Sequence, residues 1–424
     1  MVQSFSHLFS ERARGMRASE IRELLKLTQR PEIISFAGGL PNPEAFPIKD
    51  IKNITDDLLT KRGPQVLQYG TTEGVTELRE ALAARLKRDK GIDGDLKNIL
   101  ITSGSQQGLD LFSKVFIDPH DIIIVSAPTY LGGTNAFASY QAQMESVPLD
   151  EQGMIPDLLE ERLWKLHRHG KNSKMIYIIP TFQNPAGVTI SESRRKKILD
   201  VVANLDMLVV EDDPYSELRF DGDDVRSMKA LDKEDRVIYL GTFSKILAPG
   251  FRCAWLVASE EICQKLTVAK QSTDLCTNTF GQYVAYEYIA RKMVDRHILL
   301  IRKMYKRKRD IMLKAFARYF PKGVTWTKPE GGMFAWVTTP PAVDTKVMFD
   351  QAIANNVAYV VGTAFYPMAS GGRNSMRLNF THPTDEKIEE GVKRLGSVIE
   401  AEIGATSGKR RGIQRQRNGI ISGV

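Results

Sequence analysis

The chain has 424 residues, of which 42% are hydrophobic and 26% are charged, the usual composition of a globular protein. This length is sufficient for a large core and for more than one domain. No apolar stretch reaches the roughly 18 residues of a membrane span, and 1–9 lacks the basic and apolar segments of a secretory signal. We therefore expect a cytoplasmic protein without a membrane partner. Its three cysteines have neither disulfide-framework numbers nor metal-type spacing, so no metal is expected.

The formal net charge of +8 is unevenly distributed along the chain. Residues 403–424 contain no acid and contribute +5, which leaves +3 for the rest; the bases of this segment are Lys409, Arg410, Arg411, Arg415 and Arg417. Glycine and serine flank these bases, a composition that predicts a basic disordered tail over 405–424. Because the basicity belongs to a tail, a nucleic-acid partner is not expected.

Strand and helix patterns alternate along most of the chain. Apolar runs predict seven strands, at 99–102, 122–126, 144–148, 175–179, 207–211, 236–240 and 253–257. Mostly helical patterns separate these runs, which is typical of an α/β fold with a doubly wound, largely parallel seven-stranded sheet and helices on both faces. In such folds ligands bind at the carboxyl ends of the strands.

The last third of the chain has a different pattern of predicted helices and strands. After two helices near 260–291, the basic amphipathic stretch 295–320 predicts a long connecting helix. Beyond it the pattern predicts short strands and interleaved helices; the strands are at 333–337, 357–361 and 375–379, and the helices are at 345–355 and 384–402. We therefore predict a large domain over 47–310 and a smaller α/β C-terminal domain over 311–404.

Several chemically suited side chains follow the predicted strands of the large domain. Lys245 closes the motif TFSK (242–245), Asp212 and Tyr215 follow the strand at 207–211, and Asn184 follows the strand at 175–179. A lysine that condenses with an aldehyde, a buried acid that keeps a ring nitrogen protonated, and a phenol and an amide that reach a phenolic oxygen together handle pyridoxal phosphate. Once displaced, Lys245 would be the general base and acid at the substrate Cα.

A phosphate-binding turn is predicted elsewhere in the same domain. The strand at 99–102 leads through the turn 103–106 into an amphipathic helix at 109–115. Backbone N–H groups next to Gly104, the Ser105 hydroxyl and the helix N-terminus suit a dianion. Arg252 would supply a full positive charge.

With these motifs the chain resembles the fold-type I pyridoxal-phosphate aminotransferases (class I/II), and within them it is similar to the group of 2-aminoadipate and kynurenine aminotransferases. The resemblance runs in family order over about 10–402. The matching segments are IRELLK (21–26), FAGGLP (36–41), QYG (68–70), GSQQ (104–107), APTY (127–130), QNPAG (183–187), EDDPY (211–215), TFSK (242–245) and MRL (376–378).

The resemblance implies roles for further residues. Tyr130 resembles the aromatic that stacks on the cofactor ring, and Tyr69 resembles a phosphate ligand that the neighbouring subunit donates. The other implied phosphate binders are Ser105, Gln106, Thr242, Ser244 and Arg252. Arg377 resembles the arginine that binds the substrate α-carboxylate, beside Asn184 and the Gly39 backbone. Arg22 resembles a mobile arginine that meets a distal carboxylate. Thr242 departs from the serine that is frequent there, but it keeps the hydroxyl.

The family also implies a homodimer with active sites at the subunit interface, and an N-terminal arm (1–46) that packs with the small domain. Its ping-pong cycle passes an amine from an L-amino acid to a 2-oxo acid such as 2-oxoglutarate. The donor stays open among 2-aminoadipate, aromatic (including kynurenine) and branched-chain amino acids.

Two other classes of function stay open at this point. A β-lyase, decarboxylase or racemase on the same scaffold would need Lys245 and Asp212 equally. A regulatory protein could use an aminotransferase-like body as the sensor of a DNA-binding module, but the resemblance begins by about residue 10, which argues against a preceding winged helix.

Overall fold

The computed structural model describes residues 5–16, 30–367 and 370–421, the last of these without the side chains of 407–421. The helices of this part of the chain are α1 Glu11–Gly15, α3 Ile48–Val66, α4 Thr76–Lys90, α5 Ser105–Phe116, α6 Leu131–Ser139, α7 Pro156–Arg168, α8 Glu192–Asn204, α9 Met228–Leu231, α10 Glu260–Gln271, α11 Thr279–Ala290, α12 Met293–Tyr319, α13 Thr345–Ala354 and α14 Asp385–Ile421. No helix within it combines the length and the hydropathy that crossing a membrane requires.

A large sheet of eight strands carries the first two thirds of the chain, in the order β2-β9-β8-β7-β6-β3-β4-β5. Its strands are β2 Ile99–Thr102, β3 Ile122–Ala127, β4 Gln143–Asp150, β5 Gly153–Met154, β6 Ser173–Ile178, β7 Leu208–Asp213, β8 Val237–Thr242 and β9 Ala254–Val257. The strands from β8 to β4 pair in parallel, whereas β9 is antiparallel to both its neighbours. The predicted α/β fold is confirmed. The extra strand β5 has two residues, too few to give a periodic pattern.

Alternation along the strands divides the interior into two apolar cores, one on each face of the sheet. Val209 and Val237 belong to the core shared with α7 and α8, and Val210 and Ile238 belong to the core shared with α5. Because successive strand residues point to opposite faces, consecutive polar residues at the end of β7 are also delivered to opposite faces.

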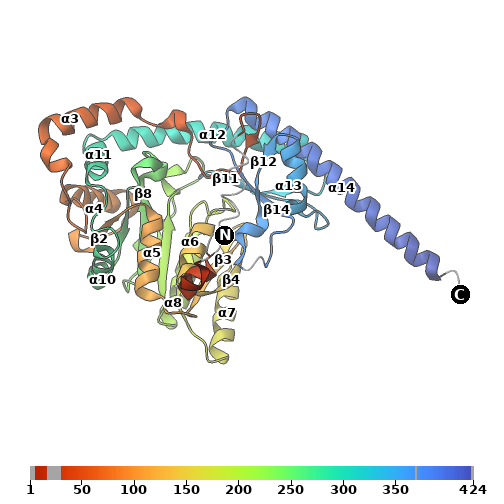
Figure 1. Ribbon diagram of the computed structural model, residues 1–424, viewed down its shortest axis with the longest axis horizontal. Coiled ribbons are helices and arrows are strands. Elements are labelled where there is room, and N and C mark those ends of the chain that lie inside the picture. Colours follow the sequence, from red (N-terminus) through yellow and green to blue (C-terminus); the bar gives the residue numbers. More distant parts are fainter. Residues whose placement is uncertain (1–4, 17–29, 368–369, 422–424) are drawn as a thin grey trace.

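A smaller four-stranded sheet, β10-β11-β14-β13, follows the long helix α12. Its strands are β10 Thr325–Trp326, β11 Phe334–Thr338, β13 Val360–Val361 and β14 Ser375–Asn379. Figure 1 shows α12 running along the top of the molecule, between the part that carries the large sheet and the part that carries the small one. The boundary between 310 and 311 therefore falls inside a continuous helix, and the domain limits stay a prediction.

The predicted strand at 357–361 is two strands that serve different sheets. β12 (Val357–Ala358) pairs with β1 (Ile34–Ser35), while Val360 and Val361 pair with β14. The segment around β1 thus lies next to the small sheet, and the predicted N-terminal arm stays a prediction. The beginning of the arm lies elsewhere, because the Arg12 guanidinium of α1 stands 5.2 Å from the Tyr140 ring centroid at the end of α6.

Helix α14 is longer than the sequence predicts. It continues from Asp385 to Ile421 and extends past the body of the molecule in Figure 1. This corrects the prediction of a disordered tail over its helical part, 405–421. The segment lacks proline, and extension of an existing helix adds one hydrogen bond per residue without a new nucleation cost. Its glycines, which suggested disorder, cost about 1 kcal/mol each but do not end a helix.

Candidate active site

A cavity of about 690 Å³ lies at the carboxyl ends of the parallel strands. Most of the residues that the sequence singles out line it: Gly39, Ser105, Gln106, Tyr130, Asn184, Asp212, Tyr215, Thr242, Ser244, Lys245, Arg252 and Arg377. These residues come from positions as far apart as 39 and 377. The fold therefore brings the separate motifs into one site.

Asp212 presents a carboxylate that is only half satisfied. It is 3% exposed, and its Oδ2 accepts a hydrogen bond of 2.8 Å from the Tyr177 hydroxyl. Its Oδ1 is buried without a partner in the described part of the chain. Burial raises the pKa of Asp212 to about 7, the Tyr177 hydrogen bond lowers it, and the charge of Asp213 raises it. Such a carboxylate is suited to a buried cation or N–H donor.

Lys245 ends the 3₁₀ turn Phe243–Lys245 that follows β8. Its Nζ donates a hydrogen bond of 3.1 Å to the Gly39 carbonyl. Burial, and next the positive charges of Arg377 and Arg252, lower the pKa of Lys245 to about 8. A substantial fraction of the amine is therefore unprotonated slightly above neutral pH, as a nucleophile or a general base requires.

The turn before α5 forms an anion cradle. Gly104 has a φ of +80°, and a Cβ there would come within 2.7 Å of the Arg252 Cζ. The guanidinium thus lies directly over the glycine, which a larger residue could not allow. The Ser105 hydroxyl is buried without a partner among the described residues, while Thr242 donates 2.9 Å to the Ser244 Oγ. Hydroxyls, a helix N-terminus and a cation meet here, as a phosphate requires.

The other end of the cavity is built around Arg377 on β14. Its Nη1 donates 2.9 Å to the Asn184 Oδ1, and its Nη2 donates 2.8 Å to the Ala37 carbonyl. The guanidinium carbon lies 4.2 Å and 5.0 Å from the ring centroids of Phe334 and Phe365. Nε has no partner within the described residues. Arg377 thus joins the large sheet, the small sheet and the N-terminal arm at the cavity.

Three predicted residues do not line this cavity. Gly104 affects the cavity indirectly, because its lack of a side chain leaves room for the Arg252 guanidinium. Tyr69 is 79% exposed, so it does not reach the cavity of its own chain. Arg22 lies outside the described residues.

Sequence reasoning missed Tyr177, Phe334 and Phe365. Tyr177 occupies a predicted strand, and the signal was a hydroxyl in an otherwise apolar buried run, one residue before the end of β6. Phe334 likewise lies at the start of β11. The two phenylalanines give no comparable signal, because an aromatic residue in a strand is ordinary core material.

The family model for aminotransferase class I and II matches residues 34–395. The chain belongs to the class I and II aminotransferases. This aminotransferase is similar over nearly its whole length to named aminotransferases. Aromatic-amino-acid aminotransferase 1 of Thermococcus litoralis is 53% identical over 399 residues, which cover 94% of this chain and 95% of the relative.

Solved structures agree with the family assignment. The kynurenine aminotransferase of Pyrococcus horikoshii, solved in complex with PMP, is 53% identical with a TM-score of 0.91; the match covers 93% of this chain and 98% of that one. The alpha-aminoadipate aminotransferase of Thermus thermophilus, solved with N-(5'-phosphopyridoxyl)-L-leucine, is 38% identical with a TM-score of 0.87, covering 95% and 100%. The protein therefore has the fold-type I fold of pyridoxal-phosphate aminotransferases and is a transaminase.

Proposed function

We propose that the protein binds pyridoxal 5'-phosphate in the 690 Å³ cavity and transfers the amine of an aromatic L-amino acid to 2-oxoglutarate by a ping-pong cycle. The observation that carries the proposal is the shared cavity of Lys245, Asp212 and Arg252. A nucleophilic amine, a buried acid and a phosphate cation are the three groups that the aldehyde, the ring nitrogen and the phosphate of this cofactor require.

The polar groups left without partners support the fit. Asp212 Oδ1 and Ser105 Oγ are buried and unpaired within the described part of the chain, although such groups normally find a hydrogen bond. A protonated ring nitrogen would satisfy the first and a phosphate oxygen the second. Tyr130 and Ile179 add the apolar surface that an aromatic ring needs.

Bound pyridoxal phosphate supplies the electron sink that weakens the Cα–H bond of an amino acid. The chain supplies the rest. Asp212 would keep the ring nitrogen protonated, and Asn184 and Tyr215, joined by a contact of 3.5 Å, would hold the phenolic oxygen. Arg377 would bind the α-carboxylate, and the Lys245 amine would carry the Cα proton, first as general base and then, as an ammonium, as general acid.

The cavity favours an aromatic donor. The cations among its described lining residues are Lys245, Arg252 and Arg377, and each already has a role. A donor with an apolar side chain needs no further cation in the cavity. A donor with a second carboxylate would need one more. The two relatives at 53% identity bear the names of aromatic and kynurenine aminotransferases. For the dicarboxylic acceptor 2-oxoglutarate, Arg22 is the residue proposed to move in.

We also propose a homodimer in which the partner subunit completes each phosphate site. Tyr69 and Leu67, two positions apart in the sequence, are 79% and 70% exposed, which leaves two large side chains uncovered in one short segment. A second subunit that covers them would bring a phenol to the cofactor phosphate, in accordance with the role that the resemblance implies for Tyr69.

Visible absorbance of the protein with pyridoxal phosphate tests the proposal. L-Phenylalanine, L-kynurenine, L-2-aminoadipate, L-leucine and L-glutamate are added separately, and the conversion of the cofactor to its amine form is followed. Fast conversion by the two aromatic donors is the expected result. Faster conversion by 2-aminoadipate would favour the dicarboxylic alternative, and a coloured protein that no donor converts would favour lyase or decarboxylase chemistry.

A selective effect is expected when Arg22 is replaced by alanine. The rate constant of the half-reaction with 2-aminoadipate or 2-oxoglutarate should fall about 10-fold to 100-fold, since these ligands lose a carboxylate partner. The half-reaction with phenylalanine should be nearly unchanged. Stopped-flow absorbance measures both, and equal losses for the two classes would remove Arg22 from the site.

A further inference from the structure

The end of strand β7 separates two cavities. Asp212 lines the active-site cavity, while its neighbour Asp213 lines a second cavity of about 680 Å³ on the other side. Both carboxylates are buried, at 3% and 7% exposure. Adjacent strand residues point to opposite faces, so two negative groups lie back to back, with only the strand between them.

Lys90 neutralises the charge of Asp213, the carboxylate on the side of the second cavity. It is the last residue of α4, its side chain is 14% exposed, and its Nζ lies 3.1 Å from Asp213 Oδ2. The same ammonium donates to the Ser216 hydroxyl, and the Tyr239 hydroxyl donates 2.8 Å to Asp213. Among the ion pairs of the described residues, Lys90 is the one cation paired with Asp213.

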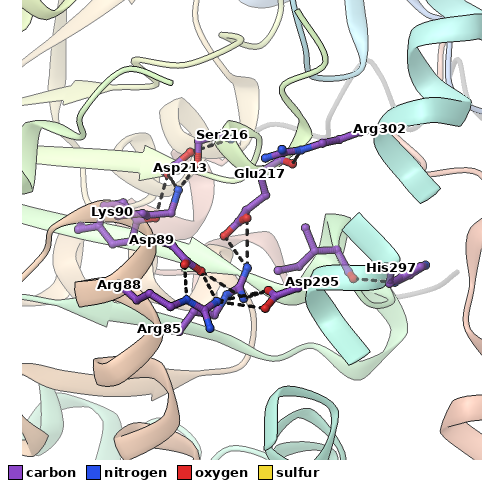
Figure 2. Close-up of polar contacts among 12 residues, drawn as sticks. Arg85, Arg88, Asp89, Lys90, Asp213, Ser216, Glu217, Asp295, His297 and Arg302 are labelled. Carbon is purple, nitrogen blue, oxygen red and sulfur yellow. Dashed lines mark hydrogen bonds and ion pairs between the residues drawn. The ribbon is translucent and has the colours of Figure 1, made fainter. Parts of the chain in front are cut away.

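The turn that follows β7 is held from the same side (Figure 2). Ser216 donates its hydroxyl, at 2.6 Å, and its N–H, at 3.0 Å, to Asp213. Arg85 of α4 lies 3.2 Å from Glu217 Oε2, and Arg302 of α12 donates 2.7 Å to the Glu217 carbonyl. Tyr215, the active-site phenol, lies in the chain between Asp213 and Ser216, which these hydrogen bonds join.

We propose that Lys90 is a positioning residue of the active site: by neutralising Asp213 behind the strand it keeps Asp212 ionised, and by fixing Ser216 it holds the turn that carries Tyr215. The inference rests on the proposed function, because it concerns the acid that faces the cofactor ring nitrogen.

The charges around the two acids set the direction of the effect. Burial raises the pKa of Asp213, but Lys90, Ser216 and Tyr239 outweigh it and hold this pKa below its usual value. For Asp212, burial raises the pKa, the Tyr177 hydroxyl lowers it and Asp213 raises it. Without Lys90, the adjacent acids would share an uncompensated charge, so the pair would take up a proton at higher pH.

The remaining groups that face these acids do not replace Lys90. Tyr130 and Tyr215 face Asp212 from the cavity, and both phenols are neutral because burial raises the pKa of each. Glu211 shares the face of Asp213, and Arg195 of α8 bonds to carbonyls and to the Thr181 hydroxyl. The Arg195 charge acts on Asp213 without a direct contact.

The dissociation constant of apoprotein and pyridoxal phosphate, measured by absorbance titration across neutral pH, tests this role. On the acidic side the affinity should fall as Asp212 takes up a proton, and we call this fall the acidic limb. In Lys90→Met the acidic limb should move to higher pH by about one unit. Lys90→Arg should restore most of the shift. Adding Asp213→Asn to Lys90→Met should also restore it, because the uncompensated charge is gone. Asp213→Asn alone should move the limb to lower pH.

A matched control separates this effect from general loss of stability. Lys308 is also a buried lysine, 3% exposed, and pairs at 3.6 Å with Asp385; neither residue lines the cavity. Lys308→Met should leave the limb in place. An unshifted limb in Lys90→Met, or an equal shift in Lys308→Met, would overturn the inference. If Lys90→Met does not fold, an unshifted Asp213→Asn overturns it. Wild-type protein that does not bind pyridoxal phosphate would instead refute the proposed function.

Discussion

Replacing Lys245 by alanine is expected to lower kcat by at least about 10⁴-fold, since the nucleophilic amine and the general base are removed together. No second lysine lines the cavity among the described residues. The fold should survive, because Lys245 makes one hydrogen bond of 3.1 Å, to the Gly39 carbonyl. Steady-state turnover of phenylalanine with 2-oxoglutarate measures the loss, and circular dichroism checks the fold.

Two variants sharpen the interpretation of this result. Lys245→Arg keeps the positive charge, but a guanidinium does not lose its proton at neutral pH, so it should be as inactive as the alanine variant. Lys174→Ala removes a surface lysine paired with Asp118 and Asp121 and should be fully active. Retained turnover in Lys245→Ala would show that another group is the proton carrier.

Asp212→Asn should reduce kcat/KM on the order of 10³-fold, equivalent to about 4 kcal/mol of transition-state stabilisation. The amide keeps the shape and can still accept from Tyr177, but it lacks the charge that holds a ring nitrogen protonated. Affinity for pyridoxal phosphate should fall as well. Steady-state kinetics and absorbance titration measure the two effects, and an active Asn variant would contradict the role of Asp212.

The substitution Asp212→Asn, which should lower activity, should raise the stability of the apoprotein. The pKa of Asp212 is raised from 3.8 to about 7 in the folded chain. The folded state therefore holds a proton that the unfolded state has already lost, so wild-type apoprotein loses stability as the pH rises from about 4 to 7. Above this window apo Asp212→Asn should have a higher Tm than wild type, measured by calorimetry.

Glu211 provides the matched control for Asp212. It is the preceding residue, equally buried, and its carboxylate accepts hydrogen bonds of 2.9 and 2.8 Å from the backbone N–H groups of Met228 and Lys229. Glu211→Gln should lower stability by about 1–3 kcal/mol, because the amide nitrogen that replaces one carboxylate oxygen cannot accept a hydrogen bond and leaves one of these buried N–H groups without a partner. Turnover should be retained, because Glu211 faces away from the cavity.

The sequence was informative where periodic burial and strand ends coincide. Seven strands of the large sheet were predicted to within two residues or so because a strand buried on both faces is a short continuous apolar run. Lys245, Asp212 and Asn184 were predicted together because strand ends of a parallel sheet share one edge. Their roles stay predictions until the variants are measured.

Other features depend on contacts that no local pattern encodes. Lys90 ends a charged helix, and nothing in its neighbourhood distinguishes it from Lys87 or Arg88 of the same helix. Its partner Asp213 is 123 residues away. The division of 357–361 between two sheets and the continuation of α14 past 402 likewise follow from what these segments pack against or extend. Propensity alone does not contain that information.

The acids at the end of β7 make the length of this strand part of the chemistry. Insertion or deletion of a single residue upstream of Glu211 would turn each following side chain to the other face. Asp213 would then enter the cofactor cavity without its lysine, and Asp212 would meet Lys90 instead. A variant of this kind would keep both acids and Lys90, yet its electrostatic arrangement would be inverted. The number of residues in β7 before Glu211 is therefore constrained by the chemistry on both faces of the strand.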